Sequence, residues 1–434
     1  MAPLDSRGRS GFDHLVMRKP EILAPAGDRS CLAAALRAGA DAVYFGLRGL
    51  NMRALAARGF RVSELGRVAA DCHAAGAGCY LALNTIIHEN ELPKVRRILA
   101  AAKEAGIDAV ICWDFAVIRM AVEIGLPVHL STQASVSNSE SMAFFHQTFG
   151  IRRFVVAREC TLAQIRAMRR RLTEVLGRKA GESIGIEVFA HGAMCVAVSG
   201  RCFMSESQYG LSANRGECRQ PCRREFRITD EDSDAGFRVG RDYLLSPEDL
   251  CTLPFLDKLI DAGVVSLKIE GRGRAPEYVD TVVRCFRRAV DFYCDNKGRR
   301  GFRKDWDELG RELMEGLGRV FHRGMSSGFY MGRAIDQWTD QPGNRATHSK
   351  RPIGRVVNYY RKASAMEIEV KDAEFATGDE IMVQGPTTGV LRQRVESIQV
   401  EHEERPAARR GERVAVRIDG VVRRQDRVFL VVRR

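Results

Sequence analysis

The chain has 434 residues, of which 45% are hydrophobic and 28% charged, and its formal net charge is +13. This composition is typical of a globular protein with one large domain and a smaller one, and the absence of any run of about 18 apolar residues excludes a membrane-spanning helix. The basic excess favours a polyanion or an anionic metabolite as partner, with a merely solvated basic surface as the alternative.

Residues 1–20 are predicted to be a polar, basic extension, because they lack the apolar core of a secretory signal. We therefore expect a cytoplasmic protein that makes no membrane contact. In that reducing compartment the twelve cysteines are expected to be core thiols or ligands, not disulfides.

Short apolar strands alternate with amphipathic helical stretches over residues 21–335. Eight strands, each followed by a helix, predict a (β/α)8 barrel of the TIM type. A doubly wound open sheet is the alternative, but it usually has fewer strands, and no G-x-G-x-x-G follows the first strand here. The strands are predicted at Glu21–Ala24, Ala42–Phe45, Gly78–Asn84, Ala109–Trp113, Val128–Ser131, Arg153–Ala157, Gly185–Ala190 and Val265–Ile269, and helices between them at Ser30–Ala38, Ser63–Ala75, Leu92–Ala105 and Leu162–Leu176.

Barrel enzymes carry their active sites at the carboxyl ends of the strands. The residues expected there are polar and mixed, as an active-site rim should be. They are Pro25–Asp28, Gly46, Asn84, Asp114, Gln133, Arg158, Glu159, His191 and Glu270–Arg272.

A cysteine-rich insertion, residues 191–251, leaves the seventh strand and returns before the eighth, so it is expected on the same face as the rim. Four of its cysteines fall within 28 residues, which is too dense for ordinary core use. Soft thiolates converging from loops are what iron–sulfur clusters and structural zinc require. The spacing differs from the C-x2-C knuckle of zinc ribbons.

The predicted ligands are Cys195, Cys202, Cys218 and Cys251. Cys251 is preferred as the fourth because it is expected in a loop just before strand eight, and Cys222 is the alternative. Free cysteine packs as a small hydrophobe, so the remaining seven are expected in the core. These are Cys31, Cys72, Cys79, Cys112, Cys160, Cys285 and Cys294.

After the eighth strand, two helices at Glu277–Cys294 and Trp306–Phe321 are predicted to lead into a linker over residues 336–351. Residues 352–434 then alternate apolar and polar side chains, which predicts a small antiparallel β-barrel module. Such modules often bind RNA, and equally often cap or dimerise; the basic charge favours RNA here. Its strands are expected at Pro352–Tyr360, Ala365–Val370, Glu380–Gln384, Val390–Val400, Arg413–Ile418 and Val428–Val432.

Several segments together resemble one known family. The longest runs from Glu187 to Cys222 and contains His-Gly-Ala-Met-Cys-Val-Ala-Val-Ser-Gly-Arg-Cys and Asn-Arg-Gly-Glu-Cys-Arg-Gln-Pro-Cys. Shorter segments are Glu-Ile-Leu-Ala-Pro-Ala-Gly from Glu21 and Ser-Leu-Lys-Ile-Glu-Gly-Arg from Ser266. These closely resemble the signature of the collagenase-like peptidase family U32, over roughly residues 20–332.

The resemblance implies a 4Fe–4S cluster held by the cysteine quartet. Members of this family resemble hydroxylation proteins despite the family name. Some act on carbon 5 of a pyrimidine in RNA, either a wobble uridine in tRNA or a cytidine in 23S rRNA, and depend on prephenate; others serve oxygen-independent ubiquinone hydroxylation. The appended basic module favours the RNA branch. A partner protein of the same family is a further expectation.

His191 and Glu270 are the catalytic candidates on this interpretation. His191 ends strand seven and could move protons or donate to a cluster sulfide; its structural alternative is to fix the turn at Gly192. Glu270 ends strand eight, where it could contact substrate or support the residues that do.

Arg158 and Arg272 are expected to bind the two carboxylates of prephenate, because guanidinium groups bind carboxylates in a bidentate manner. The alternative is that such arginines pair with glutamates as barrel scaffold. The other substrate-binding candidates are Asn84, Gln133 and Lys268.

Two rival functions stay open. A peptidase would need a nucleophile or a zinc site, and no H-E-x-x-H occurs; the G-x-S-x-G at Gly324–Gly328 follows a predicted helix and is interpreted as a turn. The second rival is an iron–sulfur accessory protein of ubiquinone hydroxylation.

Overall fold

The computed structural model describes residues 19–229, 232, 236–239, 245–332, 337–341 and 343–434. Most of the predicted N-terminal extension, residues 1–18, lies outside the described residues. No described helix has the length and apolar character that a membrane crossing needs.

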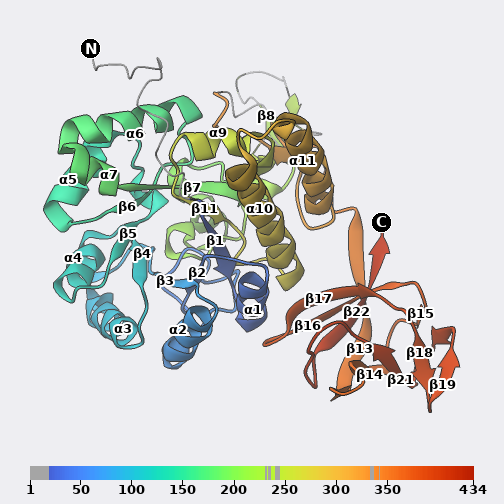
Figure 1. Cartoon of the computed structure of the whole chain (residues 1–434). Helices are drawn as coiled ribbons and strands as arrows, with labels where there is room; N and C mark the ends of the chain where they lie inside the picture. The colour runs from blue at the N-terminus through green and yellow to red at the C-terminus, as the bar shows by residue number, and fades with distance from the viewer. Residues whose placement is uncertain (1–18, 230–231, 233–235, 240–244, 333–336, 342) are drawn as a thin grey trace.

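Eight parallel strands close into a barrel in the order β11-β1-β2-β3-β4-β5-β6-β7, with β7 pairing back onto β11 (Figure 1). The predicted (β/α)8 barrel is therefore confirmed, with strand ends that differ slightly from the predicted ones. The barrel strands are β1 Glu21–Ala26, β2 Ala42–Gly46, β3 Gly78–Ala82, β4 Ala109–Cys112, β5 Val128–Leu130, β6 Arg153–Val155, β7 Gly185–Gly192 and β11 Ser266–Ile269.

Helices cover the outside of the barrel, and several begin at polar caps that the sequence places directly after a strand. Asp28 and Asp114 accept backbone N–H bonds at the first turns of α1 and α4, and Thr161 forms a capping box with Gln164 at the start of α6. The outer helices are α1 Arg29–Arg37, α2 Leu65–Ala74, α3 Leu92–Glu104, α4 Phe115–Glu123, α5 Ser139–Phe149, α6 Leu162–Leu176, α7 Arg178–Ser183, α9 Leu256–Asp261, α10 Pro276–Asn296 and α11 Phe302–Gly318.

Alternating side chains of the strands build two layers. On β1, Ile22 and Ala24 pack in the large core between strands and helices, whereas Leu23 packs inside the barrel with Tyr44 and Tyr80. This period of two is what aims every second side chain of a barrel strand along the barrel interior.

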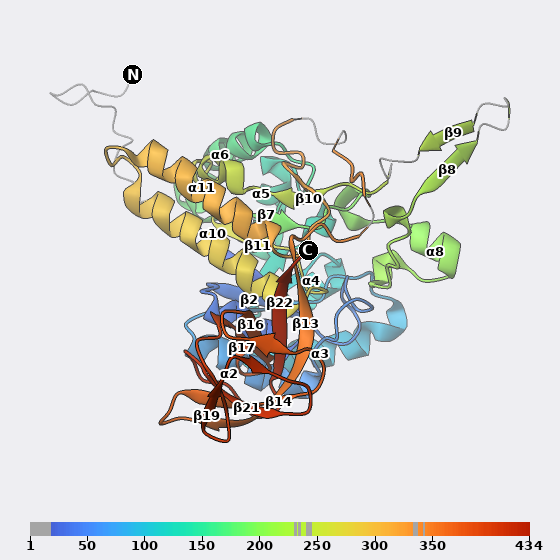
Figure 2. The same ribbon diagram turned by 90° about the vertical axis from the view of Figure 1, so that its right-hand side faces the viewer.

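The cysteine-rich insertion follows β7 and contains α8 Met204–Tyr209, the paired strands β8 Phe226–Thr229 and β9 Gly236–Val239, and β10 Asp249–Cys251. Strand β10 pairs antiparallel with the end of β7 and parallel with β12, Met325–Ser326. Figure 2 shows α8 and the β8–β9 pair projecting to one side of the barrel.

The C-terminal module is an antiparallel sheet in the order β17-β16-β22-β13-β14-β21-β18-β19, around its own apolar core. Strand β13 begins inside the predicted linker, and the single strand predicted at 390–400 is divided into β17 and β18. The strands are β13 His348–Tyr360, β14 Ala365–Val370, β16 Glu380–Gly385, β17 Gly389–Arg394, β18 Ile398–Val400, β19 Glu403–Arg405, β21 Arg413–Arg417 and β22 Arg427–Arg433, with a small pair β15 Phe375–Ala376 and β20 Ala407–Ala408.

The module docks on the outside of the barrel against α1 and α10. Ala34 of α1 is buried with Met382, Val390 and Phe429 of the module. The rim of this contact is polar, with Lys350 Nζ 2.9 Å from a carboxylate oxygen of Glu277.

Candidate functional site at the barrel mouth

A pocket of about 120 Å³ lies at the carboxyl ends of the barrel strands. Its lining comes from strand ends, from the loop after β2, and from the cysteine-rich insertion; no described residue after Arg272 contributes. The prediction that insertion and rim meet on one face is therefore correct in its geometry.

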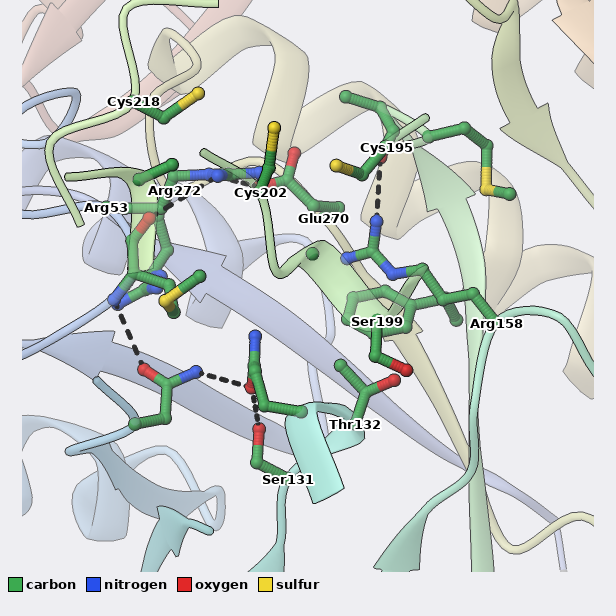
Figure 3. Close-up of a pocket in the computed structure, with 18 of the residues that line it drawn as sticks. Arg53, Ser131, Thr132, Arg158, Cys195, Ser199, Cys202, Cys218, Glu270 and Arg272 are labelled. Carbon is green, nitrogen blue, oxygen red and sulfur yellow. Dashed lines mark hydrogen bonds and ion pairs between the residues drawn. The ribbon is translucent and has the colours of Figure 1, made fainter. Parts of the chain in front are cut away.

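Four half-buried thiols line this pocket: Cys195, Cys202, Cys218 and Cys222. Figure 3 shows Cys195, Cys202 and Cys218 on one side of the pocket, with Ser131 and Thr132 on the opposite side.

Backbone donors point at two of the sulfurs. Met204 N donates to Cys202 Sγ at 3.4 Å, and Gln220 N donates to Cys218 Sγ at 3.4 Å. Such N–H···S bonds stabilise thiolates and tune the clusters that thiolates hold.

The thiols are close enough to influence one another's protonation. Burial raises the pKa of Cys222 to about 11, Arg223 opposes that rise, and the sulfurs of Cys195, Cys218 and Cys202 add to it. Among the described residues no three His, Cys, Asp or Glu side chains converge on a point that one metal ion could occupy. Four thiols that line one pocket are donors of the kind that a thiolate-held metal centre would need.

Cys251, the residue preferred as the fourth ligand, does not line this pocket. It lies on β10 rather than in a loop, it is buried in the apolar core, and its Sγ is 3.7 Å from Met314 Sδ of α11. Burial raises the pKa of this thiol to about 12. Cys222, the alternative, is the fourth cysteine that lines the pocket.

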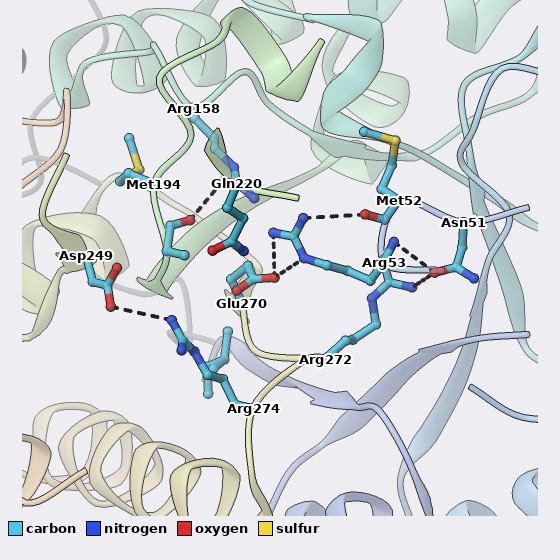
Figure 4. A network of polar contacts seen from close by, with 12 residues as sticks. Asn51, Met52, Arg53, Arg158, Met194, Gln220, Asp249, Glu270, Arg272 and Arg274 are labelled. Atoms are coloured by element: carbon cyan, nitrogen blue, oxygen red, sulfur yellow. Dashed lines mark hydrogen bonds and ion pairs between the residues drawn. The ribbon is translucent and has the colours of Figure 1, made fainter. Parts of the chain in front are cut away.

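Glu270 forms the central ion pair of the pocket, with its Oε1 2.9 Å from both Nε and Nη2 of Arg53 (Figure 4). Burial opposes ionisation of Glu270, but Arg53, Arg158 and Arg274 together lower the pKa of its carboxyl to about 2. Glu270 is therefore an anion at neutral pH, and it accepts from Arg53 instead of offering a proton. Sequence reasoning missed Arg53, because it lies in an irregular loop that only the fold brings to strand eight.

Two arginines of the pocket, the buried Arg272 and the half-buried Arg158, make no ion pair with a carboxylate among the described residues. Arg272 Nη1 donates to Asn51 Oδ1 at 2.8 Å, and Arg158 Nη1 donates to Ala193 O at 3.1 Å while its guanidinium lies 3.8 Å above the Phe189 ring. Burial lowers the pKa of Arg272 to about 10, and it stays charged at neutral pH. An anion entering the pocket would meet two guanidinium groups that make no ion pair with a carboxylate in the described part of the chain.

Gly46 provides the space for the Arg272–Asn51 contact. A Cβ at this position would lie 2.6 Å from Asn51 Cγ and 2.7 Å from Arg272 Nη1. Glycine is thus required by close packing rather than by its backbone angles.

Asn84 and Gln133 form a neutral amide pair on another side of the pocket. Asn84 Nδ2 donates to Gln133 Oε1 at 3.1 Å, and Ser131 Oγ donates to the same oxygen. Because Gln133 Oε1 already accepts these bonds, the NH2 of this side chain is the group that can donate to a ligand. The structure brings both predicted residues to the pocket.

Lys268 reaches the pocket but is already paired inside the barrel. Its Nζ lies 2.8 Å from Glu187 Oε1, and both side chains are buried. Burial lowers the pKa of Lys268, and Glu187 counteracts this. Lys268 therefore supports the floor of the pocket as half of a buried ion pair and is not a free cation.

His191 is not in the pocket, and its predicted catalytic role does not fit this placement. The ring packs near Tyr278 and Phe286 of α10, with Nδ1 buried and lacking a hydrogen bond. Burial lowers its pKa to about 3. A register shift between β7 and β11, where Phe189 opposes Lys268 but His191 opposes Ile269, turns the His191 ring towards the helices.

The remaining rim residues cap helices or hold the insertion in place. Asp28 and Asp114 cap helices, as described above, and Glu159 Oε1 accepts from Ser199 N at 2.8 Å in the insertion. Ser326 of the G-x-S-x-G segment is buried on β12, and its Oγ accepts from Gly328 N at 3.3 Å. It does not line the pocket.

Fold and pocket together define a TIM-barrel protein with a thiol-rich, arginine-lined site at the barrel mouth. The model of "Peptidase family U32" matches residues 27–340, so the chain belongs to peptidase family U32. The resemblance seen in the sequence is thereby confirmed.

Relatives within this family carry different names. A collagenase of Porphyromonas gingivalis is 40% identical over 411 residues, which cover 94% of this chain and 97% of that protein. The tRNA hydroxylation protein P1 of Bacillus subtilis is 31% identical over 392 residues, 88% of either chain. A 23S rRNA 5-hydroxycytidine synthase of Escherichia coli is 33% identical over 317 residues, covering 73% of this chain and 46% of that protein.

Proposed function

We propose that this protein is an iron–sulfur RNA-modifying enzyme that replaces the C5–H of a pyrimidine by C5–OH in tRNA or 23S rRNA, with prephenate as cosubstrate and without molecular oxygen. The observation that carries the proposal is the joint lining of one pocket by four thiols and by two arginines that make no ion pair among the described residues. The relatives named for tRNA and rRNA hydroxylation support the substrate class.

Cys195, Cys202, Cys218 and Cys222 would hold a 4Fe–4S cluster. When bound, such a cluster supplies redox or Lewis-acid chemistry beside the pocket. The protein's own contribution is the half-buried position of the thiols and the N–H donors to Cys202 and Cys218.

Prephenate would lie against Arg158 and Arg272, one for each of its carboxylates. Arg272 is buried and Arg158 is half-buried, and charge-assisted bonds are strongest where water is excluded. Glu270, ionised and held by Arg53, would repel a misplaced carboxylate and so fix the direction in which the dianion binds. The free amide of Gln133 is positioned to hydrogen-bond a neutral group such as a pyrimidine carbonyl.

The test is an anaerobic assay with purified, iron-loaded protein, prephenate and total RNA, followed by digestion and mass spectrometry of the nucleosides. A gain of 16 mass units on uridine or cytidine that requires prephenate is the expected result, that being the mass of one oxygen atom. An unchanged nucleoside profile would contradict the proposal.

Hydrolysis of collagen is the second candidate, favoured by the 40% identity to a protein named collagenase. The same preparation should be incubated with heat-denatured collagen. Release of new amino termini that persists in Cys195→Ser and disappears in Ser326→Ala would favour a peptidase over an RNA hydroxylase.

A further inference from the structure

The insertion exposes apolar side chains at the edge of the pocket. Phe203 is 73% exposed although its neighbours Cys202 and Met204 both line the pocket, and Val198 is 62% exposed next to the pocket-lining Ser199. Both side chains are therefore accessible to a molecule that borders the pocket.

Hydrogen bonds hold this edge in place. Ser135 Oγ donates to Ser199 Oγ at 2.9 Å, and Ser199 N donates to Glu159 as noted above. Cys202 N donates to Asn214 Oδ1 at 3.1 Å. The exposure of Val198 and Phe203 is therefore built into an anchored loop.

The same insertion carries three exposed arginines. Arg201, Arg219 and Arg224 are exposed, and none makes an ion pair with a carboxylate among the described residues. The guanidinium of Arg224 lies 5.5 Å from the Tyr209 ring, and that of Arg201 lies 6.0 Å from the Trp113 ring.

We propose that this edge, consisting of Val198, Phe203 and Tyr209 with Arg201, Arg219 and Arg224, is a stacking platform for an unpaired nucleobase of single-stranded RNA next to the base that enters the pocket. The inference rests on the proposed RNA substrate and names the surface that receives it. Aromatic side chains interleaved with arginines are what single-stranded nucleic acid binds, because every base has a π-face and every linkage a phosphate.

Charge decides between RNA and a peptide as the occupant. The three exposed guanidinium groups, which make no ion pair with a carboxylate in the described part of the chain, complement a phosphate backbone with a negative charge at every linkage, whereas a peptide backbone is uncharged. The location of the pocket also favours the insertion over the C-terminal module as the part that holds RNA beside the target base. The module docks on α1 and α10 and contributes no residue to the pocket lining. Figure 2 shows α8 projecting on a side that the module does not cover.

The test measures the affinity of the full-length protein for a fluorescein-labelled RNA hairpin with a seven-nucleotide loop, by anisotropy. Phe203→Ala should weaken binding about tenfold, in line with the 1–3 kcal/mol that stacking contributes per base, and Phe203→Trp should restore it. Phe115→Ala is the matched control, because Phe115 is 61% exposed on α4, outside the pocket lining. Both residues are exposed, so neither change should disturb folding, which a melting curve checks.

Salt dependence tests the arginines separately. Arg219→Ala should reduce the log–log salt slope by about 0.7, the value for one single-strand phosphate contact. Arg166→Ala, an exposed arginine on α6, should leave the slope as it is.

The outcomes separate this inference from the proposed function. Tight RNA binding that Phe203→Ala and Arg219→Ala leave unchanged would overturn the platform while the RNA substrate stands. No RNA binding by the wild-type protein, together with Phe203-dependent binding of a labelled collagen peptide, would overturn both.

Discussion

The guanidinium of Arg272 is buried, yet the hydrogen bond found for it in the described part of the chain is to a neutral amide, Asn51. A buried cation without a counter-charge is costly, and proteins keep one where a ligand supplies the charge. Arg158 repeats the arrangement across the same pocket, with a carbonyl and an aromatic ring as its partners.

Removing one of these arginines should weaken prephenate binding. For Arg272→Ala we expect a loss of about 1.5–3 kcal/mol, the typical contribution of a hydrogen bond to a charged group, measured by isothermal titration calorimetry. Arg272→Lys should recover only part, because lysine lacks the bidentate fork. If Arg158→Ala and Arg272→Ala both retain wild-type affinity, the anion does not bind here.

The fourth ligand of the proposed cluster can be decided between two cysteines. Cys222→Ser should lose most of the iron and sulfide found after anaerobic reconstitution, because its thiol lines the pocket with the other three. Cys251→Ser should keep both, since its thiol packs against Met314. The reverse pattern of iron content would refute the assignment.

His191 should influence stability at acid pH rather than catalysis. Its folded-state pKa of about 3 lies below the ordinary value of 6.5, so the unfolded chain takes up the proton first as pH falls. The stability that neutral His191 provides is complete above pH 6.5 and is lost towards pH 3, with a slope of up to about 1.4 kcal/mol per pH unit.

His191→Gln removes this titration, so its melting temperature should fall less than that of the wild type between pH 7 and pH 5. If the melting temperatures of the two proteins fall by the same amount over that pH range, the imidazole of His191 is not held neutral by the fold.

At the scale of elements, periodicity and strand count were sufficient to predict the barrel. Ala109–Cys112 is a continuous apolar run because β4 is buried on both faces, and the eight such runs with intervening helices admit few other folds. The direction in which individual side chains point was harder to predict from the sequence. The register shift between β7 and β11 reoriented His191, and the pairing of β10 placed Cys251 against α11; neither leaves a signal in a single sequence.

Contacts between residues far apart in the chain likewise limited how much of the pocket could be predicted from the sequence. Arg53 and Glu270 are far apart in the chain, and only the closure of the barrel between β1 and β11 brings their loops together. The four pocket thiols, by contrast, are local in sequence, and Cys251, the predicted ligand that lies beyond the dense stretch, does not line the pocket.

The contact between module and barrel gives a prediction at this scale. Gly389, at the start of β17, has a positive φ of 65°, and a Cβ there would lie 2.7 Å from the backbone nitrogen of Ala34. Gly389→Val should therefore push the module away from α1 and destabilise the protein by about 1–3 kcal/mol. Faster proteolysis between barrel and module would reveal it, with Gly411→Val as a control that meets no atom within 4 Å.

For the whole molecule, the arrangement separates three tasks. The barrel orients the arginines and Glu270, the insertion supplies thiols and an exposed edge, and the module covers Ala34 on the outside. The net charge of +13 gives the whole surface an attraction for a polyanion, which the local arginines then direct to the mouth.

The most direct test of the central claim is mass spectrometry of nucleosides from the RNA of a strain that lacks this gene. The account predicts the loss of one C5-hydroxylated pyrimidine from tRNA or 23S rRNA, its return with the wild-type gene, and no return with the Cys222→Ser gene. An RNA nucleoside profile identical to that of the parent strain would contradict it.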